Sequence, residues 1–341
     1  MRTFANRVAG KLLWKLLRYL PYAQIPHQVL RFRFPSRIEI EPTSVCNLEC
    51  PLCETPRSRR KKGRMSLDDF TRIIDEVRGR ITRCNMGLFG EPLLNTDIFK
   101  MVRYAESAGI RIRISTNATL LDRYIDELFS SRLTQLVVCL DGASKETHEA
   151  YRVGSKFETV RDNIRLVCAE KAKRAVEYPH IKLQFVVMKH NEHEMGKIEG
   201  LARELGVDTL SLKSTFLPTS LGQEQKIHFA KEYLPQSLSL SRFILKDGTV
   251  QVKFRPNVCH WIKSSVIQWN GDVTMCCHDY HGELVVGNVF RDGGFQKVWE
   301  SESYRRARKS VVRREYELCR NCNMSDKVNI RNRTLQLRDG H

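Results

Sequence analysis

The amino-acid sequence predicts an α/β fold, in which a partial barrel of six β/α units is followed by a small C-terminal unit. Strand-like and helix-like segments alternate from Arg37 to about Lys213, a pattern that favours parallel strands with helices outside. Six units are fewer than the eight that close a barrel. Farther along, the pair Asn270-Gly271 stands between two strand-like runs and predicts a β-hairpin in the C-terminal unit.

Five predicted helices connect the six predicted strands. The strands span Ile38–Glu41, Cys84–Phe89, Arg111–Ser115, Gln135–Leu140, Lys182–Met188 and Thr209–Lys213. The first helix begins at Ser66 with a capping-box-like Asp69, and the others lie near Asp97–Ala108, Asp122–Ser131, Lys156–Lys171 and Glu192–Leu205. We therefore expect an N-terminal lead-in at residues 1–36, the barrel at 37–217, a linker at 218–248, the C-terminal unit at 249–330 and a tail at 331–341.

Composition indicates a globular protein with an acidic partner. The chain has 341 residues, 41% of them hydrophobic, which is enough for a sizeable core. A formal net charge of +18 favours nucleic acid, anionic lipid, or a phosphorylated or acidic substrate as partner. Basic runs lie at Arg57–Arg64 and Arg305–Arg314. The first run is a candidate rim for an active-site mouth, although a solvated loop or helix face is the more common explanation of either run.

The chain is expected to be cytoplasmic. It has no recognisable signal peptide and no run of about 18 apolar residues that would span a bilayer. Its eleven cysteines have clustered spacings that favour metal binding in a reducing compartment over disulfides. Residues 7–20 predict an amphipathic helix with basic and leucine faces, which either lies on the inner face of a membrane or packs on the barrel.

Cys46, Cys50 and Cys53 form the strongest motif, C-x3-C-x2-C, directly after the first predicted strand. A structural zinc site or a cluster that only transfers electrons normally has four protein ligands. No Cys or His lies between Glu54 and Arg83, so this loop supplies three. The motif therefore predicts a [4Fe–4S] cluster with one open iron, at which a substrate or cosubstrate binds.

This loop and the motifs after it resemble the radical S-adenosylmethionine (SAM) enzymes, over roughly Arg37 to Lys213. The resemblance implies a (β/α)6 TIM-like partial barrel, with the amino and carboxylate groups of SAM on the open iron. It places candidate SAM contacts at the ends of later strands, where the active-site groups of such folds gather. These candidates are Gly90, Glu91, Ser115, Asn117, Asp141, Arg152, Met188 and Leu212.

Four positions depart from the residues usual in that family. Leu52 stands where an aromatic residue often covers the adenine, and Phe89 replaces the first glycine of the Gly-Gly-Glu-Pro motif. Ala118 replaces a glycine after the third strand, and Cys139 replaces a serine near SAM. Arg152 is a plausible partner for the SAM carboxylate, because a guanidinium binds a carboxylate with two parallel hydrogen bonds.

A second cysteine set, in the C-terminal unit, has the pattern C-x16-C followed later by C-x2-C. Its members are Cys259, Cys276, Cys319 and Cys322. Alone, this pattern fits zinc or a fully ligated [4Fe–4S] cluster. Behind such a barrel it resembles the SPASM/twitch extension, which implies one auxiliary [4Fe–4S] cluster with four protein ligands. Cys277 is the adjacent alternative to Cys276, and we expect Cys84, Cys139, Cys168 and Cys277 to have no metal role.

The resemblance implies an enzyme that reductively cleaves SAM to a 5′-deoxyadenosyl radical, which abstracts hydrogen from a substrate. It also implies a low-potential electron donor of the flavodoxin or ferredoxin type. The main hypothesis is a two-electron oxidation of a carbohydrate, cyclitol or lipid-linked sugar. The alternative is maturation of a ribosomal peptide or protein side chain. A remote alternative, a metal-stabilised nucleic-acid-binding protein, is disfavoured because the basic runs have few aromatic residues.

Overall fold

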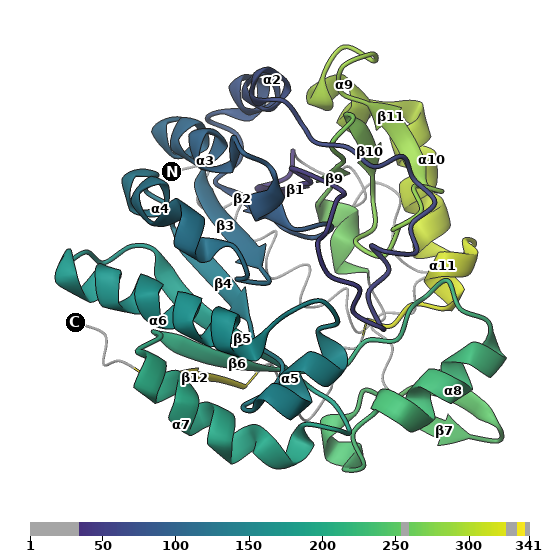
Figure 1. Ribbon diagram of the computed structural model, residues 1–341. Coiled ribbons are helices and arrows are strands. Elements are labelled where there is room, and N and C mark those ends of the chain that lie inside the picture. Colours follow the sequence, from purple (N-terminus) through teal and green to yellow (C-terminus); the bar gives the residue numbers. More distant parts are fainter. Residues whose placement is uncertain (1–33, 254–258, 325–332, 338–341) are drawn as a thin grey trace, which may run out of the picture.

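The computed structural model describes residues 34–253, 259–324 and 333–337, and its centre is a ten-stranded sheet (Figure 1). Six neighbouring strands of this sheet are parallel, as predicted. They are β1 (Arg37–Ile40), β2 (Arg83–Met86), β3 (Arg111–Thr116), β4 (Gln135–Cys139), β5 (His180–Val187) and β6 (Thr209–Ser214). The predicted partial α/β barrel is therefore present in the structure.

Helices cover the outer face of these strands (Figure 1). They are α2 (Leu67–Val77), α3 (Ile98–Ser107), α4 (Ile125–Ser130), α5 (Lys145–Tyr151), α6 (Phe157–Lys173) and α7 (Met195–Leu205), with the short 3-10 turns η3 (Pro92–Leu94), η4 (Leu121–Tyr124) and η5 (Glu192–Glu194). Ser66 caps α2 as predicted, since its hydroxyl accepts the Asp69 amide hydrogen at 3.0 Å. The helix expected at Asp122–Ser131 is divided into η4 and α4, and α5 was not predicted.

The two faces of the sheet differ in polarity. Ile112 and Ile114 of β3, like Leu183 and Phe185 of β5, belong to the large apolar core under the helices. Because side chains alternate along a strand, the residues between them face the inside of the barrel. That inner face carries many polar and charged side chains, including Glu39, Asn85, Arg113, Ser115, Lys182, Gln184 and Lys213.

The C-terminal unit extends the barrel sheet. β9 (Val266–Ile267) pairs in parallel with β1, and β10 (Asp272–Thr274) returns antiparallel beside it. The predicted hairpin at Gly271 is confirmed, with φ of +84° at that glycine, and β11 (Val285–Asn288) continues the sheet. The helical elements of the unit are η7 (His260–Lys263), α9 (Phe295–Glu300), α10 (Glu302–Val312) and α11 (Glu317–Arg320).

A carboxylate of the barrel caps a helix of the C-terminal unit. The N-cap position of α9 is Gly294, which has no side chain to accept a hydrogen bond. Glu76 of α2 supplies the acceptor instead, with its two carboxylate oxygens 2.7 Å from the amide nitrogens of Phe295 and Gln296. The two parts of the chain are therefore joined by packing as well as by the shared sheet.

The segment predicted as a linker is folded. It contains α8 (Gln223–Tyr233), η6 (Leu238–Leu240) and β7 (Phe243–Lys246), which pairs with β8 (Thr249–Val252) in a small separate sheet. Tyr233 and Phe243 pack in one apolar cluster with Cys50 and Leu52. The segment thus covers the first cysteine loop, because this cluster buries apolar surface that the loop would otherwise expose.

The other end of the sheet is closed by part of the segment predicted as a tail. β12 (Arg333–Gln336) pairs antiparallel with β6, so β6 does not end the sheet. The predicted N-terminal amphipathic helix lies outside the described residues. Among the described residues, none of the helices has the length and apolar character needed to cross a membrane. The predicted domain limits stay predictions.

Candidate functional site

The loop with the first three cysteines is held by its own backbone. The amide of Leu48 donates to Cys46 Sγ at 3.4 Å, and the amide of Cys53 donates to the carbonyl of Cys50 at 3.0 Å. The Glu49 amide donates to the carbonyl of Val153 at 3.0 Å, which ties the loop to the turn after α5. The three thiols are thereby placed at the carboxyl end of the barrel strands.

The environment of these thiols fits a positively charged metal cluster. Cys50 is 6% exposed, and burial raises the pKa of its thiol to about 11, while the nearby Arg152 opposes this. Burial and the neighbouring Cys53 also raise the pKa of Cys46. Bound metal favours the deprotonated form of such thiols. Within the described residues no three His, Cys, Asp or Glu side chains surround a single ion position, but a four-iron cluster places each sulfur on a different iron.

Gly90 lies where two backbone segments come close together. Its φ is +67°, and a β-carbon there would lie 2.2 Å from the carbonyl oxygen of Thr43 and 2.8 Å from that of Val45. The next amide, that of Glu91, donates to the Val45 carbonyl at 2.8 Å. A glycine is therefore required for the end of β2 to pack against the start of the cysteine loop.

The Glu91 side chain is buried and engaged within the protein. Its carboxylate accepts hydrogen bonds from Thr116 Oγ1 at 2.7 Å, the Asn117 amide at 2.7 Å and the Leu93 amide at 3.0 Å. The residue is 2% exposed. Glu91 thus joins the ends of β2 and β3, and this geometry favours positioning of the SAM pocket over direct contact of its carboxylate with SAM.

The turn after β3 contacts the cysteine loop directly. Asn117 Nδ2 donates to Asn47 Oδ1 at 2.9 Å, and Asn47 Nδ2 donates to Thr119 Oγ1 at 3.0 Å. Ala118, which follows, has φ of +64°, a conformation that favours glycine and explains why glycine is usual there. Ser115 lies near the end of β3 on the inner face of the barrel, with its Oγ 3.7 Å from Cys139 Sγ.

Asp141 and Arg152 form a buried ion pair beside Cys50. Arg152 Nε and Nη2 lie 2.7 and 2.5 Å from Asp141 Oδ2, and the Val186 amide donates to Asp141 Oδ1 at 2.7 Å. The third guanidinium nitrogen, Nη1, lies 3.9 Å from Cys50 Sγ. The structure therefore brings three sequence-predicted residues together, although Arg152 has only part of its donor set left for SAM.

The last two candidate SAM contacts differ in their surroundings. Met188 is fully buried in the apolar cluster that contains Cys50 and Leu52, so it lies beside the predicted cluster loop. Leu212 packs in the large core under the helices, while its strand neighbours Ser211 and Lys213 alternate with it. The structure does not bring the Leu212 side chain to the group at the strand ends, because the alternation of β6 turns it outward.

The second set of cysteines also gathers in space. Burial, with the nearby charge of Cys276, raises the pKa values of Cys259 and Cys319 to about 12. The amide of His278 donates to Cys276 Sγ at 3.4 Å, and the Met324 amide donates to Cys322 Sγ at the same distance. Cys46 has the same turn with Leu48. The shared turn favours Cys276 over Cys277 as a ligand, and the four residues fit one auxiliary cluster.

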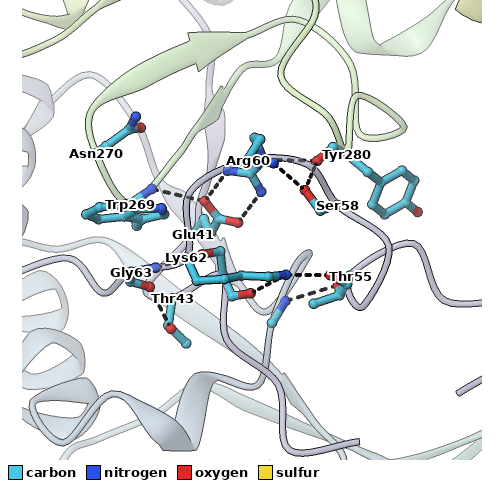
Figure 2. A network of polar contacts seen from close by, with 12 residues as sticks. Glu41, Thr43, Thr55, Ser58, Arg60, Lys62, Gly63, Trp269, Asn270 and Tyr280 are labelled. Carbon is cyan, nitrogen blue, oxygen red and sulfur yellow. Dashed lines mark hydrogen bonds and ion pairs between the residues drawn. The ribbon is translucent and has the colours of Figure 1, made fainter. Parts of the chain in front are cut away.

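A buried ion pair closes the segment that contains the first cysteine loop (Figure 2). Arg60 Nη1 and Nη2 lie 2.9 and 2.6 Å from the two carboxylate oxygens of Glu41, which is fully buried. The Trp269 amide donates to the same carboxylate at 3.1 Å. Glu41 follows β1 and Trp269 belongs to the C-terminal hairpin, so one carboxylate holds three distant parts of the chain.

Arg60 and Lys62 of the first basic run bond within the protein, whereas Arg57, Arg59, Lys61 and Arg64 are exposed. Arg60 Nε and Ser58 Oγ both donate to the Tyr280 carbonyl, at 2.9 and 2.7 Å (Figure 2). Lys62 Nζ donates to the carbonyls of Thr55 and Ser44, at 2.5 and 3.3 Å. The run thus fastens the cysteine loop to the C-terminal unit. The sequence offered no signal for this, because the partners lie some 220 residues apart.

Glu54, directly after the third cysteine, is a further residue that sequence reasoning missed. It is 2% exposed, and Ser220 Oγ lies 2.8 Å from each carboxylate oxygen. His281 Nε2 of the C-terminal unit lies 3.9 Å from the same carboxylate. Glu54 therefore connects the cysteine loop with the segment predicted as a linker and with the C-terminal unit.

Two family models match the chain at these sites. The model of the radical SAM superfamily matches residues 40–202, and the SPASM model, an iron–sulfur cluster-binding domain, matches residues 259–323. The chain belongs to the radical SAM superfamily. As a radical SAM enzyme with a SPASM domain, it binds a [4Fe–4S] cluster and SAM in the first domain and auxiliary iron–sulfur in the second, as predicted. Which residues contact these groups stays a prediction.

Curated radical SAM relatives differ in how much of them the chain covers. An AdoMet-dependent heme synthase from Methanosarcina barkeri is 32% identical over 56% of this chain, which spans only 53% of that synthase. A tungsten-containing aldehyde ferredoxin oxidoreductase cofactor-modifying protein from Pyrococcus furiosus is 26% identical over 84% of this chain and 87% of that protein. Mycofactocin maturase MftC from Mycobacterium ulcerans is 27% identical over 76% and 73%, respectively.

Solved structures of similar fold include three with bound molecules. SuiB from Streptococcus suis, bound to its precursor peptide SuiA, has a TM-score of 0.59 at 14% identity, over 82% of this chain and 68% of that chain. The enzyme anSMEcpe, with AdoMet and the Cp18Cys peptide, scores 0.58 at 17%, over 86% and 92%. BtrN, with AdoMet and 2-DOIA, scores 0.53 at 18%, over 89% and 100%. These likenesses confirm the predicted fold class.

Replacing Gly90 with alanine tests the close approach between β2 and the cysteine loop. We expect Gly90→Ala to lower SAM affinity about tenfold or more and to destabilise the fold by more than the roughly 1 kcal/mol of backbone strain alone. Gly109→Ala is the matched control, because Gly109 has φ of +77° and nothing within 4 Å of a β-carbon. Isothermal titration with SAM and denaturant unfolding measure both effects. Equal losses in the two variants would contradict the steric explanation.

Replacing Glu41 tests the junction between the cysteine-loop segment and the C-terminal unit, which the Glu41–Arg60 ion pair and the Trp269 amide form. Glu41→Gln leaves the Arg60 guanidinium buried without an anion, so we expect a loss of about 3–5 kcal/mol in unfolding free energy. Arg59→Gln is the control, since its pair with Glu283 at 2.7 Å is exposed on both sides and such pairs contribute about 1 kcal/mol or less. Chemical denaturation of the anaerobic protein gives both numbers. A Glu41→Gln variant with the same unfolding free energy as Arg59→Gln would show that the Glu41–Arg60 pair does not stabilise this junction.

Proposed function

We propose that this radical SAM enzyme is a maturase that modifies a ribosomal peptide or a protein side chain. The observation that carries the proposal is the alignment with mycofactocin maturase MftC, which extends over 284 residues and thus beyond the barrel match at 40–202. MftC proteins of two further mycobacterial species are 26% identical over at least 70% of their length. This support favours the alternative hypothesis, maturation of a peptide or protein side chain, over the main hypothesis of carbohydrate oxidation.

The carbohydrate hypothesis has weaker support. BtrN, whose structure contains 2-DOIA, is 18% identical, so its likeness supports a shared fold and nothing further about substrate. Two relatives have names that point to cofactors, the Methanosarcina heme synthase and the Pyrococcus cofactor-modifying protein. Modification of a cofactor is therefore the second candidate, and the sequence identity of 26% over 319 residues is what favours it.

In the proposed mechanism Cys46, Cys50 and Cys53 hold the cluster, and Cys259, Cys276, Cys319 and Cys322 hold the auxiliary one. When bound, the first cluster delivers the electron that cleaves SAM. Arg152, fixed by Asp141, keeps a positive charge 3.9 Å from Cys50 Sγ, which stabilises the thiolate form.

Other side chains of the site keep its geometry and exclude water. Glu91 locks the turns after β2 and β3 together, so the pocket wall beside the cysteine loop is preformed. The buried Met188, Leu52 and Tyr233 form an apolar cover around Cys50. A dry, rigid surround protects a reactive radical from solvent and aims it at one C–H bond.

SAM cleavage is the first test. The anaerobically reconstituted enzyme with SAM and dithionite should form 5′-deoxyadenosine, and Cys50→Ala should abolish it. Cys168→Ala is the matched control, because Cys168 is buried in the core under the helices and has no predicted metal role. Chromatography with mass spectrometry measures the product. Undiminished cleavage by Cys50→Ala, or none by the wild type, would remove the basis of the mechanism.

Peptide modification is the decisive test of substrate class. Short peptides encoded beside the gene should change mass during SAM cleavage, by about two hydrogens for a crosslink or oxidation. Cyclitols and sugar alcohols are offered in parallel reactions. Turnover of these alcohols without any change in the peptides would refute the maturase proposal and restore the carbohydrate hypothesis.

Iron content tests the auxiliary ligands. Wild-type protein with two [4Fe–4S] clusters holds about eight irons per chain. Cys276→Ala should lose about half of them, whereas Cys277→Ala should retain them, because the amide hydrogen bond from His278 is directed at Cys276. Iron and acid-labile sulfide assays measure this. Loss in Cys277→Ala alone would reassign the ligand.

A further inference from the structure

Three cationic side chains lie on the inner face of the barrel sheet. Arg113, Lys182 and Lys213 come from β3, β5 and β6, and each alternates with residues of the outer core. The charge of Arg113 acts on both lysines, and the charge of Lys182 acts on Lys213. The three therefore form one group inside the barrel, termed the inner cations below.

The inner cations lack anionic partners in the described parts of the chain. Arg113 Nε is fully buried without a hydrogen-bond partner. Neither lysine takes part in any ion pair or hydrogen bond found among the described residues, and Arg242 adds a further positive charge near Lys213. The carboxylate that acts on Arg113 is Glu39, which accepts from Asn85 at 2.7 Å and is too distant from Arg113 for an ion pair.

This arrangement is unfavourable for folding. Burial and the neighbouring cations lower the pKa of Lys213 to about 8, and burial also lowers the pKa of Lys182. A structural role would be served by a paired or apolar residue. Groups held at a cost in stability, without partners of their own, are typical of sites that bind a ligand of opposite charge.

The positions of Arg113 and Lys182 suit a substrate rather than SAM. Arg113 lies two residues before Ser115 on the same face of β3, and Lys182 lies two residues before Gln184 on β5. Two residues along a strand span about 7 Å, so Arg113 and Lys182 lie deeper than the ends of β3 and β5, whereas Lys213 pairs in register with Val186 near the end of β5. Gln184 Nε2 and Ser115 Oγ both lie 3.7 Å from Cys139 Sγ, which separates the two deeper cations from Arg152 above.

We propose that Arg113, Lys182 and Lys213 bind a carboxylate group of the substrate inside the barrel. A guanidinium binds a carboxylate with two parallel hydrogen bonds, and the ammonium groups add charge and further donors. The choice of carboxylate rests on the proposed function, because the anionic groups of an unmodified peptide are acidic side chains and the C-terminal carboxylate. The anchored carboxylate would hold the reacting residue below the strand ends, in line with the SAM contacts.

Anion titration of the reconstituted protein tests the proposal without turnover. Glutarate, inorganic phosphate and chloride are compared at equal ionic strength and pH 7, with melting temperature and isothermal titration as readouts. We expect glutarate to raise the melting temperature saturably above the chloride reference. Arg113→Met and Lys213→Met should weaken glutarate binding about tenfold or more. The exposed Lys100, replaced by methionine, is the control and should bind as the wild type does.

The variants also separate binding from a structural role. Without anion, Arg113→Met and Lys213→Met should melt at or above the wild-type temperature, since each removes a repelled cation. Lower melting of both variants, or glutarate effects equal to those of chloride, would overturn the proposal. Phosphate binding without glutarate binding through the same residues would refute the carboxylate assignment. Because the titration needs neither SAM cleavage nor a peptide, its failure leaves the maturase tests independent.

Discussion

The buried pair of Glu41 and Arg60 is the contact on which the site depends. The cysteine loop lies between these two residues, and their ion pair joins its ends at 2.6 Å. The same carboxylate accepts the Trp269 amide, so the loop, the first strand and the C-terminal hairpin meet at one group. Closing a loop of about 20 residues costs conformational entropy that local contacts must offset. A fully buried carboxylate with three donors contributes to that offset, together with the antiparallel bridge between Thr43 and Arg64.

Phe89, a departure from the family pattern, is accounted for by the junction between the barrel and the SPASM unit. The residue replaces a glycine of the usual motif and is 2% exposed. Its ring lies 5.0 Å from that of Tyr280 and 5.3 Å from the Arg60 guanidinium. The larger side chain thus fills the junction between the barrel and the SPASM unit, with an aromatic pair and a cation–π contact. At this position the departure from the family pattern is an interface residue.

Sequence reasoning found the barrel because its strands alternate regularly, and it predicted the site from motifs that follow strand ends in a fixed order. Ser66, Gly90 and Gly271 have local signatures that the structure reproduces. Contacts between distant segments had no such signature. Glu54 with Ser220, and Glu76 with the start of α9, join residues more than 160 positions apart. The folded segment at 223–252 was also missed, because its weakly amphipathic helix packs on the cysteine loop and not on the main core.

The net charge of +18 acquires a different meaning from the structure. Two members of the first basic run, Arg60 and Lys62, bond to the cysteine-loop segment, whereas Arg57, Arg59, Lys61 and Arg64 are exposed. In the second run Arg308 is 5% exposed and lies 4.0 Å from the rings of Trp299 and Tyr304. Arg60 and Arg308 therefore do not contribute to a basic surface, which is formed by the exposed members of the two runs. Arg113, Lys182 and Lys213 do argue for an anion, because their charges face one another inside the barrel where water screens them less. The acidic group that we propose is therefore one part of a substrate, held by the barrel.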